Sequence, residues 1–218
     1  MTNCCLCSNF ASDLLAEPWN RPLFASTNFV VLPSLGSLVE GWVLIVPKEH
    51  FICIGALPAE LVAEMNHLKS QVCSVLGSIY GELCAFEHGP KANARNVGCG
   101  VDHAHLHIVP IHYDLVAAST SFAPRDTEWH SATFENCREA FEKQQDYLYV
   151  EQPIGVGRIS TSSDFGSQIF RKAIAASLGV FGQFSWREYP QTEIIAKTIN
   201  TLSVKPQRQL DIRSYEPA

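Results

Sequence analysis

The sequence predicts an α+β fold, because short apolar strands and amphipathic helices follow one another without a repeat or a low-complexity linker. Residues 28–32 and 41–46 form apolar runs separated by turn residues, and Pro47 ends the second run, so both are expected to be strands. After Pro58, apolar residues recur on one helical face as far as Gly77 and Gly81. That spacing predicts a long helix.

The order of patterns after this helix predicts a central strand and a less regular second half. Residues 83–87 indicate a short strand, residues 88–100 a loop, and residues 101–111 a strictly alternating central strand. Helices are expected near residues 134–141, 166–178 and 192–202, with a strand at 147–150 and a loose tail from 205. We expect a catalytic domain at residues 1–118 and a C-terminal α/β extension at 119–218, packed as one unit.

Length and composition are those of a compact protein of about one and a half average domains of about 150 residues. The chain has 218 residues, of which 46% are hydrophobic and 17% charged. These values exclude a disordered chain, a collagen and a coiled coil. The net charge of −6 argues against a general nucleic-acid or anionic-membrane surface, and no apolar run is long enough to span a bilayer.

The chain contains eight cysteines but shows no secretory pattern at its N-terminus. A cytoplasmic protein with reduced thiols is therefore expected. Cys53, Cys73, Cys84 and Cys137 fall in apolar patterns and are expected in the core. The remaining cluster, Cys4-Cys5-Leu6-Cys7, needs another explanation.

The most informative stretch is His103-Ala104-His105-Leu106-His107. In a strand, alternate side chains share a face, so the three histidines are expected on one side of the sheet. Packing does not require histidine there, since β-branched and aromatic residues fill strand faces better. Imidazole serves as nucleophile, acid or base near neutral pH, so the row favours a catalytic function over three satisfied core histidines.

The spacing of Cys4 and Cys7 allows two thiolates to reach one zinc ion on a tight turn. His50, which follows a strand, is a natural third ligand, and one histidine of the row could be the fourth. A redox dithiol is the alternative, although such pairs normally stand where a strand meets a helix. Cys5 could also replace Cys4 as a ligand.

Over residues 4–110 the chain resembles the histidine triad (HIT) superfamily, in its hydrolase-like HxHxH branch with a zinc-binding CxxC. The resemblance rests on the CxxC, the strand ending in Pro47-Lys48-Glu49-His50, the long helix and the histidine row, in that order. It implies an antiparallel sheet flanked by helices, often completed by a homodimer. It also implies attack on the α-phosphorus of a nucleotide.

The resemblance assigns roles to particular residues. His105 would be the nucleophile, and His107 would contact the phosphate or assist the leaving group. Zinc would be structural and held by Cys4, Cys7, His50 and His103, the same four residues that spacing brings together. Ser34 and Leu35 correspond to positions that line the base and ribose pocket in relatives. Backbone amides at Gly98 and Gly100 are expected to hold the phosphoryl oxygens.

The chain departs from the family pattern at three places. Trp42 follows Gly41 where relatives have histidine, Cys99-Gly100 stands where they carry phosphate-binding Gln and Ser or Thr, and Glu87 or His88 replaces an Asn or Gln. His88 and His112 could join the site, but ordinary loop or edge positions are the simpler interpretation. Scattered basic residues, Arg171 among them, could serve a polyphosphate or form a solvated face.

The sequence therefore predicts a nucleotide hydrolase acting on a nucleoside phosphoramidate, a dinucleoside polyphosphate or a related nucleotidyl ester. One alternative is a nucleotidyltransferase similar to galactose-1-phosphate uridylyltransferase, a branch that typically has Gln in place of the third histidine. The other is a zinc-stabilised nucleotide-binding protein without turnover. The motifs of P-loop enzymes and α/β-hydrolases do not occur.

Overall fold

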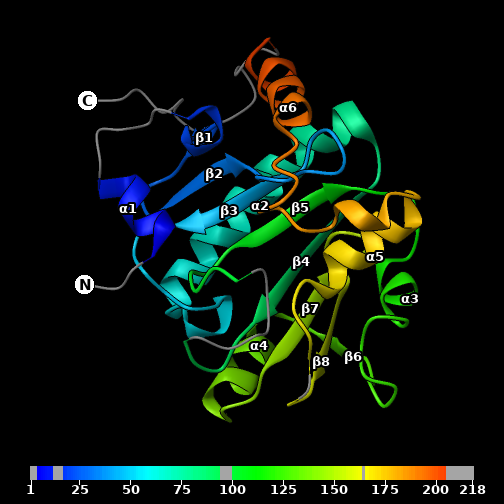
Figure 1. The fold of residues 1–218 in the computed structure, drawn as a ribbon. Helices are drawn as coiled ribbons and strands as arrows, with labels where there is room; N and C mark the ends of the chain where they lie inside the picture. The colour runs from blue at the N-terminus through cyan, green and yellow to red at the C-terminus, as the bar shows by residue number, and fades with distance from the viewer. Residues whose placement is uncertain (1–3, 12–16, 94–99, 164, 205–218) are drawn as a thin grey trace.

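The computed structural model describes residues 4–11, 17–93, 100–163 and 165–204, and it confirms the α+β fold. Its centre is an eight-stranded sheet with the order β1-β2-β3-β5-β4-β7-β8-β6. Neighbouring strands pair antiparallel throughout, and helices cover the sheet (Figure 1). The antiparallel sheet flanked by helices that the sequence predicts is therefore present.

The first half of the chain supplies five strands of this sheet. They are β1 (Phe24–Ala25), β2 (Phe29–Pro33), β3 (Val43–Pro47), β4 (Leu83–Gly89) and β5 (Leu106–Pro110). Because β5 lies between β3 and β4, its backbone is hydrogen-bonded on both sides. Every residue of β5 is buried, so the strand is a rigid support for the side chains that it carries.

The second half extends the same sheet rather than forming a separate layer. Strand β7 (Tyr147–Glu151) pairs with β4, β8 (Gly157–Thr161) pairs with β7, and β6 (His130–Ala132) pairs with β8. The sequence patterns predict β7 but not β6 or β8. These two strands have mostly polar or exposed residues, so they carry little alternation of apolar side chains.

The two faces of the sheet have separate cores. On one face lies α2 (Ala59–Tyr80), which begins after Pro58 and ends at Gly81, whose φ is +84°. Together with α4 (Phe134–Glu142) it covers Val43, Ile45 and Leu106. On the opposite face, α3 (Leu115–Ser119) and α5 (Ile169–Ser177) cover Phe86 and Val109 (Figure 1). The side chain of His107 belongs to this second face by the alternation of β5, and the ring of His105 lies beside it.

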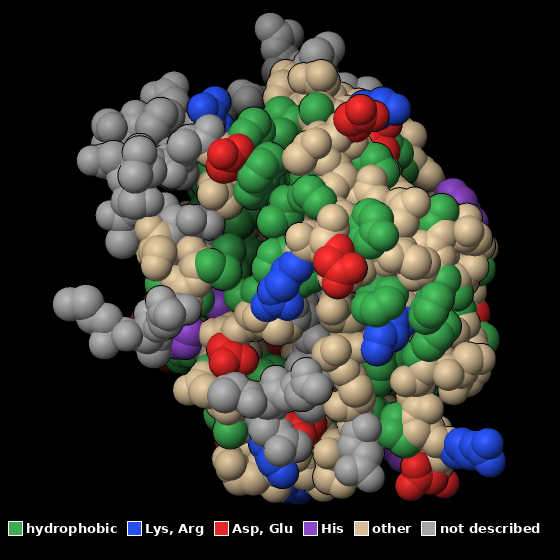
Figure 2. All heavy atoms as spheres, viewed as in Figure 1, with side chains coloured by type: hydrophobic (Ala, Val, Ile, Leu, Met, Phe, Trp, Pro, Cys, Tyr) green, Lys and Arg blue, Asp and Glu red, His purple; other side chains and the backbone are tan. Residues whose placement is uncertain are grey.

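Two further helices, α1 and α6, lie near the half of the sheet that contains β2 and β3 (Figure 1). Helix α1 is Cys5–Ala11, and α6 is Thr192–Val204. The short 3-10 turns are Pro18–Asn20, Ile54–Ala56 and Phe181–Gln183. In the space-filling view of the same side, hydrophobic side chains gather in a hollow over β2 and β3 (Figure 2). Within the described residues no helix is long and apolar enough to cross a membrane.

The expected central strand over residues 101–111 is shorter than predicted. Only Leu106–Pro110 joins the ladder, and residues 101–105 approach it without pairing. The backbone N–H of Ala104 instead donates to the carbonyl of Phe51, at 2.6 Å. This contact pulls the chain toward the loop after β3, so His103 leaves the row that strict alternation predicts.

Candidate functional site

Two groups of side chains meet at the start of β5, and the first is a cluster of four sulfur and nitrogen atoms. Cys4, Cys7, His50 and His103 each offer one ligand atom, and all four atoms lie within 4.8 Å of one another. The Sγ atom of Cys7 is 3.3 Å from Nδ1 of His50 and 3.5 Å from Nδ1 of His103. The Sγ atom of Cys4 lies 3.4 Å from the same His103 nitrogen.

These distances fit a tetrahedral metal site. Zinc bonds to sulfur at about 2.3 Å and to nitrogen at about 2.0 Å, which places ligating sulfur and nitrogen atoms about 3.5 Å apart in a tetrahedron. Two thiolates and two imidazoles are also a ligand set that zinc prefers. The four residues could therefore hold one ion, and the segments at residues 4–7, 50 and 103 would then be crosslinked.

The protonation states of the ligands favour metal binding at His103. Its Nε2 lies 2.8 Å from the carbonyl oxygen of Pro47, which can only accept, so Nε2–H donates and Nδ1 faces the cysteines. Burial lowers the pKa of His103 to about 4, which keeps the imidazole neutral, as a ligand must be. Burial, followed by the neighbouring Cys4, raises the pKa of Cys7 to about 11. A bound cation would oppose that rise by stabilising the thiolate.

The structure separates Cys5 from the two cysteines of the cluster. Cys4 and Cys7 point at the histidines, whereas Cys5 is exposed and lines the pocket described below. Cys4 immediately precedes α1 and Cys7 lies within it, so the expectation that the pair sits on a tight turn is wrong. The cysteines of the described residues form no disulfide.

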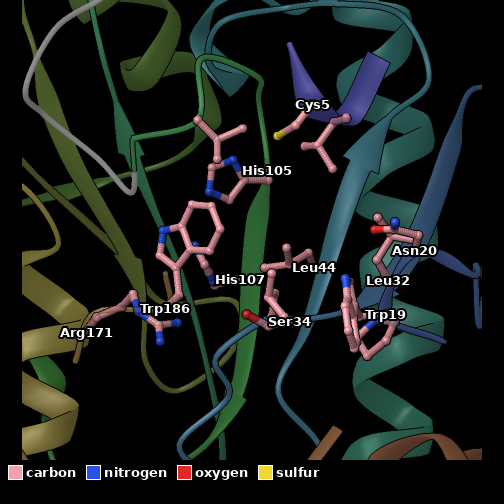
Figure 3. Close-up of a pocket in the computed structure, with 14 residues that line it drawn as sticks. Cys5, Trp19, Asn20, Leu32, Ser34, Leu44, His105, His107, Arg171 and Trp186 are labelled. Atoms are coloured by element: carbon pink, nitrogen blue, oxygen red, sulfur yellow. The ribbon is translucent and has the colours of Figure 1, made fainter. Parts of the chain in front are cut away.

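The second group lines a pocket of about 280 Å³ on the face of the sheet that α5 covers. His105 and His107 lie at one end beside Trp186 and Arg171, whereas Trp19 and Asn20 lie at the other (Figure 3). The remaining wall is mostly apolar. It comprises Cys5, Leu6, Leu32, Pro33, Ser34, Leu35, Leu44 and Val101.

His105 is held so that one ring nitrogen remains available. Its Nδ1 lies 2.6 Å from the carbonyl oxygen of His103. Because a carbonyl only accepts, Nδ1 carries the hydrogen, and Nε2 of the neutral ring has the lone pair. Burial lowers the pKa of His105, which favours this neutral form. An oriented, neutral imidazole is a suitable nucleophile.

His107 lies deeper in the same pocket. Its ring stacks on Phe86, with the centroids 4.4 Å apart, and its Nδ1 is 3.0 Å from Nε1 of Trp42. The ring centroids of His105 and His107 are 4.9 Å apart, so both imidazoles can reach one bound group. Burial, followed by the charge of His105, lowers the pKa of His107 well below its usual range.

The C-terminal half contributes two wall residues that the sequence analysis did not assign to the site. Arg171 of α5 donates from Nε to the carbonyl of Phe184 at 2.9 Å, and from Nη2 to the carbonyl of Gly36. The N–H of Gly36 donates to the carbonyl of Pro190 at 2.8 Å, so the segment with Trp186 is tied to the turn between β2 and β3. No local pattern identifies Trp186, because its place in the pocket wall depends on distant contacts such as that between Gly36 and Pro190.

The other expected residues are placed as follows. Ser34 and Leu35 line the pocket, as does His107. Gly98 lies outside the described residues. Gly100 is exposed, has a φ of +74°, and accepts at its carbonyl from Arg187 at 2.7 Å. It is not among the residues that line the pocket, although its neighbour Val101 is.

The remaining candidates differ in their surroundings. His88 is buried on the pocket side of β4 against Phe170, and its ring nitrogens have no hydrogen-bond partner among the described residues. Glu87 faces the opposite side, where it accepts from Ile54 and Tyr147. His112 is exposed beside Glu82.

The fold and the site together define an α+β protein with a Cys2His2 cluster next to a histidine-lined pocket. Residues 23–123, fewer than half of the chain, match the protein family described as "Protein similar to CwfJ C-terminal". No curated protein sequence matches the chain.

Several solved structures are similar to the chain at low identity. A HIT family protein from Bacillus anthracis has 19% identity and a TM-score of 0.41, over 52% of this chain and 76% of that one. A HIT family hydrolase from Clostridium thermocellum has 17% identity and a TM-score of 0.40, over 51% and 93%. Yeast Ap4A phosphorylase in complex with AMP has 11% identity and a TM-score of 0.42, over 72% and 64%. Similarity at this level carries no argument about the reaction.

Proposed function

We propose that this chain is a nucleotide hydrolase of the histidine triad type, in which His105 attacks the α-phosphorus. The substrate would be a nucleoside phosphoramidate, a dinucleoside polyphosphate or a related nucleotidyl ester. The observation that carries the proposal is the orientation of His105. Its Nδ1–H is bound to the His103 carbonyl, which leaves the Nε2 lone pair on a ring that lines the pocket.

The reaction would proceed in two displacements. In the first, Nε2 of His105 forms a bond to the α-phosphorus while the bond to the leaving group breaks. The leaving group departs with that electron pair and takes up a proton. In the second, a water oxygen bonds to phosphorus, the phosphorus–nitrogen bond breaks, and the water loses a proton. The products are a nucleoside monophosphate and the regenerated imidazole.

The pocket has a polar end and an apolar wall, an arrangement that suits a nucleotide ligand. The polar end carries His105, His107 and the cationic Arg171, which suit a phosphoryl group. The apolar wall, with Leu32 and Leu44 between this end and Trp19, suits a nucleobase (Figure 3). Residues 119–218 contribute Trp186 and Arg171, so we propose that this extension helps to select the substrate.

We further propose that Cys4, Cys7, His50 and His103 bind structural zinc. With four protein ligands no position is left for water or substrate, so the ion would supply a crosslink and not a reaction centre. Its position would hold Cys5 and Leu6 in the pocket wall, because both adjoin ligating cysteines. The backbone near Gly98 and Gly100 remains a proposed source of phosphate contacts, because Gly100 adjoins Val101, which lines the pocket.

A trapping experiment tests the proposed reaction. The wild type is mixed with a panel of nucleotides labelled at the α-phosphorus, quenched rapidly and analysed for label bound through an acid-labile bond to His105. We expect a labelled adduct in wild type and none in His105→Ala. Equal absence of adduct and turnover from both proteins across the panel would contradict the proposal and favour a binding protein.

The identity of the product separates hydrolysis from transfer. Release of a nucleoside monophosphate supports the hydrolase, whereas a new nucleotide formed only with an added sugar phosphate supports the transferase.

The expected homodimer and the cytoplasmic location are tested by light scattering and by cell fractionation.

A further inference from the structure

Trp42 and His107 form one hydrogen bond in the buried face of the sheet. Trp42 lies immediately before β3 and is fully buried, and His107 lies in the neighbouring strand β5. The indole Nε1 is 3.0 Å from Nδ1 of His107, and the two rings meet edge to face with their centroids 5.7 Å apart. This contact is an ordinary hydrogen bond by its length.

The chemistry of the two groups settles the direction of this bond. An indole N–H can only donate, so Nδ1 of His107 must be the acceptor. An accepting imidazole nitrogen carries no proton. The neutral ring therefore carries its single hydrogen on Nε2. The opposite tautomer would place two N–H groups against each other and leave both without an acceptor in a buried position.

The surroundings prevent either ring from turning away. Phe86 stacks on His107 at 14° between the ring planes, and the same phenyl ring meets the edge of Trp42 at 5.9 Å. The guanidinium carbon of Arg171 also lies over the Trp42 ring, 4.9 Å from its centroid. That guanidinium is itself held by the carbonyls of Phe184 and Gly36.

The charged form of His107 is excluded by the same arrangement. A protonated ring would direct an Nδ1–H at the indole N–H. Burial disfavours a charge on His107, and the permanent positive charge of Arg171 opposes it further. His105 and His88 would add to this opposition only if either ring were protonated. The ring is thus neutral in a single tautomer.

We propose that Trp42 is a positioning residue that fixes His107 as a hydrogen-bond donor toward the pocket. Through its Nε2–H, His107 then donates to an anionic oxygen of the bound phosphoryl group and does not act as a base. His105, fixed in the opposite tautomer by the His103 carbonyl, presents a lone pair to the same pocket. One imidazole attacks while its neighbour stabilises charge. This inference deepens the proposed function and rests on it for the identity of the bound group.

The tautomer of His107 is tested without substrate by nitrogen-15 NMR of the full-length, metal-loaded protein. The His107 signals are assigned by comparison with His107→Ala. In wild type we expect Nδ1 unprotonated and Nε2 protonated near neutral pH. A His107 ring with its hydrogen on Nδ1, or a charged ring, overturns the inference even if the protein hydrolyses nucleotides.

The variant Trp42→Phe then removes the donor and keeps an aromatic ring. We expect the His107 nitrogen signals to move toward a mixture of tautomers, because Nδ1 loses its donor. Trp129→Phe, a matched substitution at a partly buried ring beside Phe170, should leave them unchanged. If both variants leave His107 in the Nε2–H tautomer, Trp42 is not the residue that fixes it.

Kinetics with adenosine 5′-phosphoramidate complete the test. Misorientation of one donor costs on the order of 10- to 100-fold in rate, so kcat of Trp42→Phe should fall by that factor while KM changes little. Unchanged kcat with an altered tautomer would overturn the role in positioning. If wild type shows the expected tautomer but no turnover, the proposed function fails while the assignment of the tautomer stands.

Discussion

His103 and His105 are two residues apart in the chain but belong to sites of different kinds. Nδ1 of His103 faces two cysteine sulfurs, and its other nitrogen donates to Pro47. Nδ1 of His105 donates to a carbonyl, and its ring lines a pocket. The first ring has both nitrogens engaged, whereas the second has one nitrogen left for a ligand.

This difference shows that the neighbours of each nitrogen, and not the residue type, determine what a histidine can do. It also separates expected effects. Changes in the Cys4–Cys7–His50–His103 cluster should affect stability, and changes at His105 should affect turnover.

The largest effect is expected when the cluster loses a ligand. Cys7→Ala should reduce bound zinc from one ion per chain to none and lower the free energy of unfolding by on the order of 5 kcal/mol or more, because metal binding contributes directly to folding. Elemental analysis and denaturant unfolding measure the two quantities. Cys5→Ala, at the exposed neighbouring position, should retain the metal. A wild type that contains no zinc and keeps its stability after chelation would contradict the prediction.

At His105 a substitution should affect turnover much more than stability. His105→Ala should lower kcat by more than about a thousandfold, because no other group is placed to form the covalent intermediate. Its unfolding free energy should change by no more than about 1 kcal/mol, since the ring is only partly buried. His112→Ala, at an exposed histidine, should keep full turnover. Equal losses of stability in His105→Ala and Cys7→Ala would remove the distinction between the two sites.

Glu87 provides a third test, because it lies on the opposite face of β4 from the pocket. Burial raises the pKa of this carboxyl from 4.5 to about 8, despite its bonds from Tyr147 and Ile54. The folded protein therefore binds a proton that the unfolded chain releases, and this contribution to stability is lost as the pH rises from about 5 to about 8. The loss should amount to about 3 kcal/mol.

The variant Glu87→Gln should abolish that part of the pH dependence and leave kcat unchanged. Denaturant unfolding at several pH values measures the effect, with Glu82→Gln as a control at an exposed carboxyl. Parallel stability curves for wild type and Glu87→Gln would show that the carboxyl titrates normally.

The smallest effect is expected at Trp186. Trp186→Ala removes part of the apolar pocket wall, so KM for a nucleotide substrate should rise about tenfold, which corresponds to about 1.4 kcal/mol. Metal content should not change, because Trp186 is not part of the cluster. Tyr189→Ala, three residues later and exposed, is the control and should not alter KM. An unchanged KM in Trp186→Ala would show that the C-terminal wall does not contact the substrate.

The sequence predicts the first half of the fold well because its signals are local. The helix after Pro58 and strands β2 to β4 are apolar runs bounded by proline, glycine or turn residues. Three residues of the cluster can also be predicted from local patterns. Cys4 and Cys7 have the CxxC spacing of metal ligands, and His50 follows the strand that ends at Pro47. The expectation of a single straight histidine row is wrong, because the contact between Ala104 and Phe51 is not visible in a strand pattern.

The part of the site that the sequence does not reveal depends on distant contacts. Arg171 could only be considered one of several scattered cations, and its burial against Trp42 follows from the packing of α5 on the sheet. Strands β6 and β8 lack a clear alternation, so their place at the sheet edge depends on pairing with β7. The residue pattern of a single segment therefore cannot predict the place of Arg171 or of these two strands.

The tie between Gly36 and the segment at Phe184 to Pro190 has a consequence for the order in which the protein is made. Domains fold from the N-terminus as the chain is synthesised. The cluster needs nothing beyond His103, so all four of its residues are synthesised well before Trp186. The pocket wall, however, includes Trp186. If the cluster binds zinc as proposed, the ion can be bound during synthesis before the pocket is complete, and the nascent chain would acquire its metal before it could hold the proposed substrate.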